Sequence, residues 1–202
     1  SVRNNHFHLE GDIAGEVYPR WYTQDLVEVP MQFARTWAGS NMIDADVNGL
    51  FYAEASPVPV LTGLSGRHVV IEVVSGSPVQ RQAARINDGW SIFLEHQSGG
   101  DNWKGTDIAQ KMVYHHTNSI IQEAKRFVSS PWFEQELTAN VNLNSYCNAH
   151  WDGTTINFYK GNANCANTGL ISDVVFHEWG HGFDANTGGI EDGALSEGFG
   201  DI

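Results

Sequence analysis

The sequence has few basic residues: 11 Lys and Arg stand against 24 Asp and Glu, for a net charge of −13. Nothing in it offers the basic stripe that nucleic acid or an anionic membrane surface would need. No apolar run approaches the roughly 20 residues of a membrane-spanning helix. No signal peptide is recognisable either, so a secreted protein would be seen here in processed form. We therefore expect neither nucleic acid nor a membrane as a partner.

Cysteine is also scarce, with Cys147 and Cys165 as the only two. The absence of a Cys-x-x-Cys pair argues against a cysteine metal site. The two cysteines flank the segment 148–164, for which we expect a hairpin, and this placement favours a disulfide. Closing a loop of that size is worth about 3 kcal/mol in the chain-entropy model. Such a bond indicates an oxidising compartment and a secreted, extracellular protein, whereas two reduced thiols in a cytosolic protein are the alternative.

The remaining composition is that of a globular, β-rich protein, with 41% hydrophobic residues, 21 Gly, 7 Trp and 10 Phe among 202 residues. Short apolar runs separated by Gly, Pro, Asn and Asp fill the first hundred residues and predict a small antiparallel β-sandwich-like module over residues 1–100. Ser98–Asp101 has the composition of a linker. We therefore predict an α+β fold with a second domain over residues 101–202.

A helix is predicted from Thr106 to about Val128, since its apolar residues recur at helical spacing and Pro131 follows its end. It contains His115 and His116. Adjacent residues of a helix face different directions, so these two side chains cannot both bind one ion. We interpret both histidines as structural.

The segment Asp44–Gly49 matches the first half of an EF-hand calcium loop. Its twelfth position, however, is Ala55, and the flanking residues have the pattern of strands. A plain turn at Asn48-Gly49 is the better interpretation, because Asn-Gly is the strongest short hairpin signal. Calcium binding at this turn is the alternative interpretation.

His177-Glu178-Trp179-Gly180-His181 has the spacing of a zinc-binding helix. Histidines four residues apart lie one turn apart on the same face, so both imidazoles can reach one ion. The intervening glutamate would then lie beside the metal, where it can accept a proton from water. Ser172 or Asp173 could cap the helix start. Gly180 and Gly182 each cost about 1 kcal/mol in a helix, which indicates a close approach by another part of the chain.

A second motif follows, with Glu197 and Asp201 four residues apart on an expected helix. A zinc site with two histidines needs a third ligand with a negative oxygen, which Glu197 can supply. Asp201 could accept the other N–H of a ligand histidine and so fix its tautomer. An acidic, solvated helix face is the alternative interpretation.

Together these motifs resemble those of the thermolysin and fungalysin class of zinc endopeptidases, the gluzincins. The resemblance is specific at residues 173–183 and 193–201. It extends to residues 148–158, which look like the edge strand and the next strand of that family, and to 112–121, which are similar to its long helix. It covers about residues 105–202 and implies the sheet and the active-site helix that form the N-terminal half of the catalytic domain.

The resemblance also implies roles for individual residues. In metal binding, His177, His181 and Glu197 would hold zinc, and Asp201 would orient His177. Glu178 would be the general base of peptide hydrolysis. Asn148 and Ala149 would hold the backbone of a protein or peptide substrate by strand addition.

Some features depart from the family pattern. The gap between His181 and Glu197 is shorter, and Ala185 stands where a second supporting acid is expected. Either Asp184 or Asn186 would then take that place, or no residue does. In this family the histidine that stabilises the oxyanion and the helical half of the domain come later. We therefore expect the chain to be truncated after the third-ligand motif and to need the C-terminal remainder of the domain as a partner. The alternatives are a catalytically incomplete zinc-binding or protein-binding module and an aminopeptidase-like gluzincin.

Overall fold

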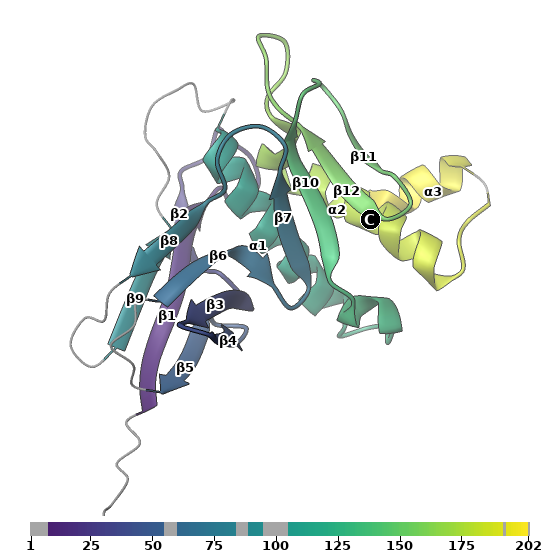
Figure 1. The fold of residues 1–202 in the computed structure, drawn as a ribbon. Helices are drawn as coiled ribbons and strands as arrows, with labels where there is room; N and C mark the ends of the chain where they lie inside the picture. The colour runs from purple at the N-terminus through teal and green to yellow at the C-terminus, as the bar shows by residue number, and fades with distance from the viewer. Residues whose placement is uncertain (1–7, 55–59, 84–88, 95–104, 192, 202) are drawn as a thin grey trace, which may run out of the picture.

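The computed structural model describes residues 8–54, 60–83, 89–94, 105–191 and 193–201. The fold is α+β, as predicted: two β-sheets pack with three α-helices, and the helices α2 and α3 lie at the end of the molecule opposite β1 and β5 (Figure 1). The predicted linker Ser98–Asp101 lies outside the described residues.

The smaller sheet is built around β1 (His8–Val17). The strands β2 (Val27–Pro30) and β5 (Leu50–Glu54) pair with it antiparallel, and β9 (Gly89–Leu94) pairs with it parallel. Alternate residues of β1 are buried, among them Ile13 at 1% exposed. This alternation is typical of a sheet with one face in the core.

The larger sheet has the strand order β11-β12-β10-β7-β6-β3-β4, with β8 also paired to β6. It continues across residue 100, because β7 and β10 pair in parallel from Leu137↔Val69 to Val141↔Val73. This sheet contains strands from before and after residue 100. The division of the chain into two domains at residue 100 stays a prediction. Its strands are β3 (Ala34–Ala38), β4 (Asn41–Asp44), β6 (Val60–Gly66), β7 (Val69–Val73), β8 (Gln80–Ala83), β10 (Leu137–Leu143), β11 (Ala149–Trp151) and β12 (Thr155–Tyr159).

The helix α1 (Thr106–Ala124) lies between β9 and β10 in the chain and contacts strands of both sheets. The predicted helix was four residues too long, because Lys125–Phe127 form a turn after Ala124 rather than a further helical turn. A 3-10 turn, η2 (Pro131–Glu134), then leads into β10. After β12 come η3 (Thr168–Leu170), α2 (Ser172–Thr187) and α3 (Gly193–Gly200).

A buried amide network joins β10, α1 and the segment before α2. Asn142 lies at a register shift in β10, with a positive φ of 59°. Its amide nitrogen donates to the carbonyl of Thr106 at 3.2 Å, and its oxygen accepts from Asn167 Nδ2 at 2.7 Å. Because Asn142 and Asn167 are both fully buried, an unpaired amide here would be costly. The network therefore fixes the segment that leads into α2.

The turn predicted at Asn48-Gly49 is present. Gly49 has φ +74°, and Asp46 Oδ1 accepts the backbone N–H groups of Asn48 and Leu50 at 2.7 and 2.9 Å. Asp44 binds Arg35 at 2.9 Å. Both carboxylates are thus engaged within the protein, and calcium binding at this turn gains no support from the structure.

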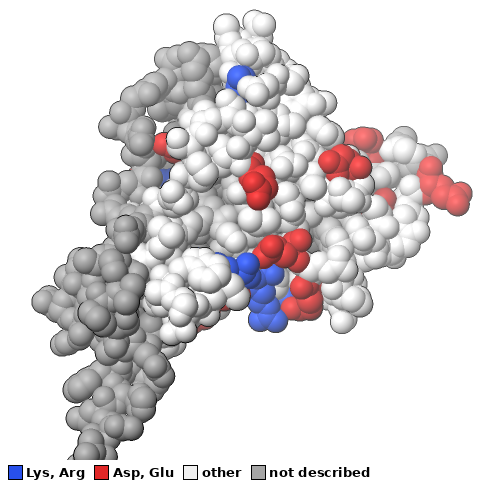
Figure 2. All heavy atoms as spheres, viewed as in Figure 1, with Lys and Arg blue, Asp and Glu red and all other residues white. Residues whose placement is uncertain are grey.

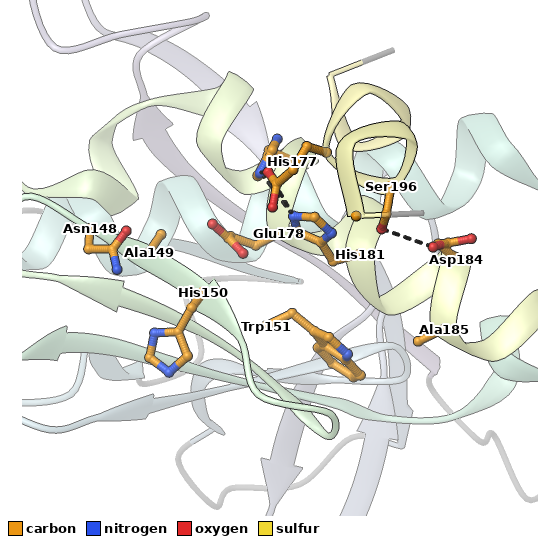
Figure 3. Close-up of a pocket in the computed structure, with 12 residues that line it drawn as sticks. Asn148, Ala149, His150, Trp151, His177, Glu178, His181, Asp184, Ala185 and Ser196 are labelled. Atoms are coloured by element: carbon orange, nitrogen blue, oxygen red, sulfur yellow. Dashed lines mark hydrogen bonds and ion pairs between the residues drawn. The ribbon is translucent and has the colours of Figure 1, made fainter. Parts of the chain in front are cut away.

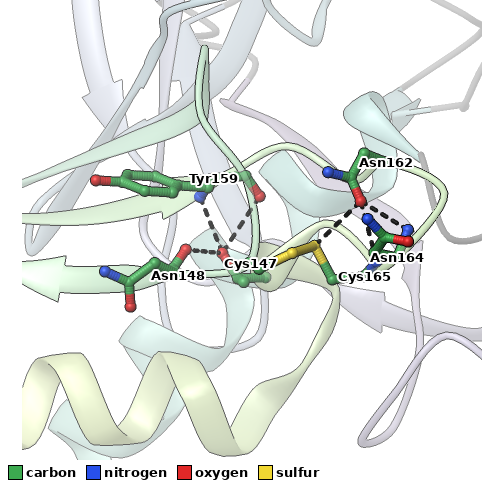
Figure 4. The surroundings of a disulfide bond; sticks show 7 residues. Cys147, Asn148, Tyr159, Asn162, Asn164 and Cys165 are labelled. Atoms are coloured by element: carbon green, nitrogen blue, oxygen red, sulfur yellow. Dashed lines mark hydrogen bonds between the residues drawn. A yellow bond between two sulfur atoms is a disulfide. The ribbon is translucent and has the colours of Figure 1, made fainter.

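The predicted disulfide between Cys147 and Cys165 is confirmed, with Cα atoms 5.5 Å apart (Figure 4). It joins the residue two places before β11 to the loop that follows β12.

The two histidines of α1 lie among structural contacts. Burial lowers the pKa of His115 to about 4, and the ring of His116 hydrogen-bonds the carbonyl of Tyr18 at 3.2 Å.

Charges on the described surface are mostly acidic or paired. On the face shown in Figure 2, most of the basic side chains lie directly beside acidic ones. Arg67 and Lys125, for example, both bind Glu134, at 3.0 and 2.7 Å. Within the described part of the chain, no helix has the length and hydropathy of a membrane span.

The buried histidines predict an acid-sensitive stability. Burial lowers the pKa of His68 and of His115 from 6.5 to about 4. Between these values the unfolded chain binds protons that the folded chain does not. The free energy of unfolding should therefore fall as the pH falls from about 6.5 to about 4, by at most about 1.4 kcal/mol per pH unit for each histidine. Urea unfolding at intervals of half a pH unit measures this slope.

The double variant His68→Gln, His115→Gln tests the assignment. The free energy of unfolding of this variant should depend less steeply on pH between about 6.5 and 4, whatever its value at pH 7. An unchanged slope would show that other groups cause the acid sensitivity.

Candidate functional site

The first turn of α2 is anchored by the N-terminal part of the chain. The backbone N–H of Ser172 donates to the carbonyl of Arg20 at 2.8 Å, and the Arg20 guanidinium binds the Asp173 carboxylate at 2.8–3.2 Å. The expectation that Ser172 or Asp173 caps the helix was wrong: Ile171 is the N-cap residue, without a side-chain cap. Instead, the bond to Arg20 lowers the pKa of Asp173 and keeps a negative charge near the helix N-terminus.

His177 and His181 lie one turn apart on α2, and their rings point toward the same position (Figure 3). Their Nε2 atoms are 3.0 Å apart. Glu197 of α3 reaches the same place, with Oε2 at 3.3 Å from His177 Nε2 and 3.6 Å from His181 Nε2. The structure thus brings together the three side chains predicted to bind zinc.

This spacing fits a single metal ion. Zinc bonds of about 2.0–2.2 Å at tetrahedral angles place neighbouring ligand atoms roughly 3.3–3.6 Å apart. Two imidazole nitrogens and one carboxylate oxygen are also a ligand set that zinc takes in catalytic sites, with the fourth position left open. Among the described residues, these three form the only group of three or more His, Cys, Asp or Glu whose ligand atoms all lie within 4.8 Å of one another.

The other ring nitrogen of His177 has a partner as well. His177 Nδ1 lies 2.8 Å from Asp201 Oδ1, just after the end of α3. Asp201 is 74% exposed on its side chain and Glu197 is 67% exposed. A carboxylate on Nδ1 leaves Nε2 unprotonated and turned toward Glu197, which is the tautomer that a metal ligand needs.

Two glycines allow α3 to approach α2. A Cβ on Gly180 would lie 2.9 Å from the Cα of Gly200, and a Cβ on Gly200 would lie 3.0 Å from His177 Nδ1. Side chains at these positions would push α3 away from the ring of His177. The close contact with α3 explains why glycine, which disfavours helices, occurs at position 180 inside α2. It agrees with the close approach expected from the sequence. Gly182 is similarly crowded, since its Cβ would meet Trp132 at 3.0 Å.

Asp184 and Asn186 were the proposed substitutes for an acid at Ala185. Their hydrogen bonds go to groups other than the rings of His177 and His181. Asp184 Oδ2 accepts from the backbone of Ile190 at 3.2 Å and from Ser196 Oγ at 3.1 Å, and Asn186 donates to the carbonyl of Gly182. Asp184 therefore ties α2 to α3 next to Glu197. Ser196 was missed in the sequence, because a serine on an exposed helix has no pattern of its own.

Glu178 is only 5% exposed, and burial raises the pKa of its carboxyl group. Three nearby groups act on the same carboxyl. The charge of His177 and a hydrogen bond from the backbone N–H of Trp151 lower its pKa, while the charge of Glu197 raises it. The side chain of Glu178 thus lies between the two histidines and β11, near the backbone N–H of Trp151.

An open cleft of 510 Å³ runs past these groups. One wall consists of β11 with the residue before it, including Asn148 and Ala149, and the other of α2 and the start of α3 (Figure 3). Burial of Glu178 between the walls puts a carboxyl group at the centre of the cleft. His150 also lines it, and its ring packs edge-on against Tyr159 at 5.6 Å.

Aromatic rings pack against the same turn of α2. Trp179 and Phe183 stack at 5.3 Å, and Trp132 lies 5.6 Å from Trp179. Trp151 meets Trp132 edge-on at 6.4 Å and also lines the cleft. This aromatic cluster, Trp132, Trp151, Trp179 and Phe183, holds α2 against η2 and β11.

The contact between Gly180 and Gly200 predicts a specific effect on metal affinity. In Gly180→Ala the added methyl group should displace α3 and with it Glu197, so zinc affinity should fall at least tenfold. Competition with a chromogenic chelator measures this. Gly198→Ala is the matched control, because a Cβ there meets nothing within 4 Å, and its affinity should stay within twofold of wild type. Equal affinities for both variants would contradict the role of the glycine contact.

Comparison with known proteins agrees with this geometry. A family model described as the thermolysin metallopeptidase catalytic domain matches residues 102–184. None of the curated proteins matches the chain. The match includes Asn148, Ala149, His177, Glu178 and His181, and ends before α3. Residues 102–184 are therefore similar to the catalytic domain of thermolysin-like metallopeptidases.

Proposed function

We propose that this protein is a secreted zinc endopeptidase that hydrolyses peptide bonds with Glu178 as the general base. The observation that carries the proposal is the convergence of His177 Nε2, His181 Nε2 and Glu197 Oε2 beside this buried carboxyl group. The thermolysin-like match supports the metallopeptidase class.

His177, His181 and Glu197 would hold the zinc ion, and Asp201 would orient His177. When bound, zinc lowers the pKa of a water molecule toward 7 and polarises the scissile carbonyl group. The donor set fits the ion by both ligand type and spacing, as the distances of 3.0 to 3.6 Å indicate.

Glu178 would accept the proton of the attacking water and later donate it to the leaving amine. Burial suits the group for both steps, because it raises the pKa and brings the protonated and ionised forms closer in free energy. The backbone N–H of Trp151 would keep the carboxyl group in place as its charge changes.

The substrate would bind along β11, which is the last strand of its sheet. The backbone carbonyl of Asn148 accepts from Tyr159 N on the β12 side, whereas the N–H of Trp151 points to Glu178. Backbone groups alternate in direction along a strand, so those of Ala149 point toward the cleft like those of Trp151. They are available to an extended peptide, which favours an endopeptidase over an aminopeptidase.

The disulfide supports a secreted protein, because such bonds persist in oxidising compartments. The C-terminal remainder of a thermolysin-like domain is the partner we propose for the exposed side of α3. A zinc-binding or protein-binding module without turnover is the alternative, and the experiment below separates the two.

Variants of the motif test the proposal. Glu178→Gln should keep about one zinc per chain and lose hydrolysis of a quenched fluorescent peptide by a factor of about 10² or more, because the base is removed while the ligands remain. His181→Ala should lose both zinc and activity. Elemental analysis and a fluorescence assay, with and without added zinc, give the two readouts.

The wild-type chain is the reference for both variants. Zinc without hydrolysis in the wild type would favour the binding module, and wild-type rates in Glu178→Gln would falsify the base assignment. Absence of zinc from the wild type would mean that these residues do not form a metal site in this chain.

A further inference from the structure

The wall of the cleft formed by β11 is a short edge strand with little support of its own. It contains three residues, Ala149–Trp151, and among the described strands it pairs with β12 alone. Isolated two-stranded hairpins are at best marginally stable. The position of this wall must therefore depend on contacts outside the hairpin.

One such contact is the disulfide just before the strand. Cys147 has a positive φ of 59°, a conformation that non-glycine residues adopt only when their surroundings hold them there. Its partner Cys165 is bound by Asn162, whose side-chain oxygen accepts the Cys165 N–H at 3.1 Å and whose N–H donates to the Cys165 carbonyl at 2.9 Å. The disulfide thus ties the start of β11 to an ordered turn (Figure 4).

The second contact is the hydroxyl group of Thr168. It accepts the N–H of Tyr159 at 2.9 Å and donates to the carbonyl of Asn148 at 3.0 Å, so it joins β12 and the residue before β11 at one point. Thr168 is 9% exposed and belongs to η3, which packs against α1. A firmly held side chain thus fixes the carbonyl of Asn148.

Both contacts come from the segment that leads into the zinc-motif helix. Cys165 and Thr168 precede Ser172, the first residue of α2. Their bonds to Cys147 and Asn148 therefore connect the start of the β11 wall to the segment just before the helix wall.

We propose that the Cys147–Cys165 disulfide and Thr168 are positioning elements for the peptide substrate, which set β11 at the right distance from the zinc-motif helix. This inference rests on the proposed function, and it adds which groups outside the cleft determine the binding of an extended substrate. Loss of either element should weaken binding along β11 and leave zinc binding unchanged, because neither contacts His177, His181 or Glu197.

Two probes separate these effects in the zinc-loaded full chain. Acetohydroxamate binds through its metal-binding group alone, whereas a tripeptide hydroxamate also carries a backbone that can pair with β11. In Thr168→Val and in Cys147→Ser, Cys165→Ser the affinity for the tripeptide hydroxamate should fall about tenfold. Affinities for acetohydroxamate and for zinc should stay within twofold of wild type. Isothermal titration below the unfolding temperature of each variant measures all three.

Thr168→Ser retains the hydroxyl group and should bind both probes like the wild type. Thr187→Val is the matched control, since it removes a threonine hydroxyl whose bond within the described part of the chain is to the carbonyl of Phe183 in its own helix. Variants at Thr168 and at the disulfide that keep wild-type affinity for the tripeptide hydroxamate would overturn the positioning role alone. A wild-type chain that binds zinc, yet binds the tripeptide hydroxamate no more tightly than acetohydroxamate, would overturn the proposed substrate site as well.

Discussion

The close contact between α2 and α3 is the constraint on which the arrangement of the candidate site depends. Gly180 and Gly200 meet where any side chain would collide, and this lets Asp201 reach His177 Nδ1 at 2.8 Å. Glu197 is carried to the same ring by the same helix. The cost of glycine in a helix, about 1 kcal/mol, is thus offset by a ligand arrangement that a larger residue would prevent.

Local patterns in the sequence predicted which side chains the structure brings together here, because their proximity follows from helical spacing. His177 and His181 had to share a face once the helix formed, and the same argument applies to Glu197 and Asp201. What the pattern could not predict was how far apart the two helices lie. That distance depends on Gly180, and on Asp184, whose bond to Ser196 joins residues that no periodicity connects.

The fold was predictable in class and in several strands, but not in how the strands join. Parallel pairing of β7 with β10 links residues more than sixty positions apart around α1, and a parallel crossover leaves no turn signal in the sequence. The end of α1 at Ala124 was missed because Lys125 and Arg126 are good helix formers. Asn142 illustrates a further limit. Its left-handed backbone conformation and the hydrogen bonds of its buried side-chain amide depend on β10, α1 and the segment before α2 lying together.

Trp151 belongs both to the aromatic cluster beneath α2 and to the wall of the cleft. Its indole therefore has one side in a packed interior and another next to whatever occupies the cleft. Emission from an indole depends on the polarity around it, so displacement of water from β11 changes an optical signal that the protein already carries. The cleft thus contains its own reporter group, and ligand binding can be followed in unlabelled protein even where no bond is cleaved.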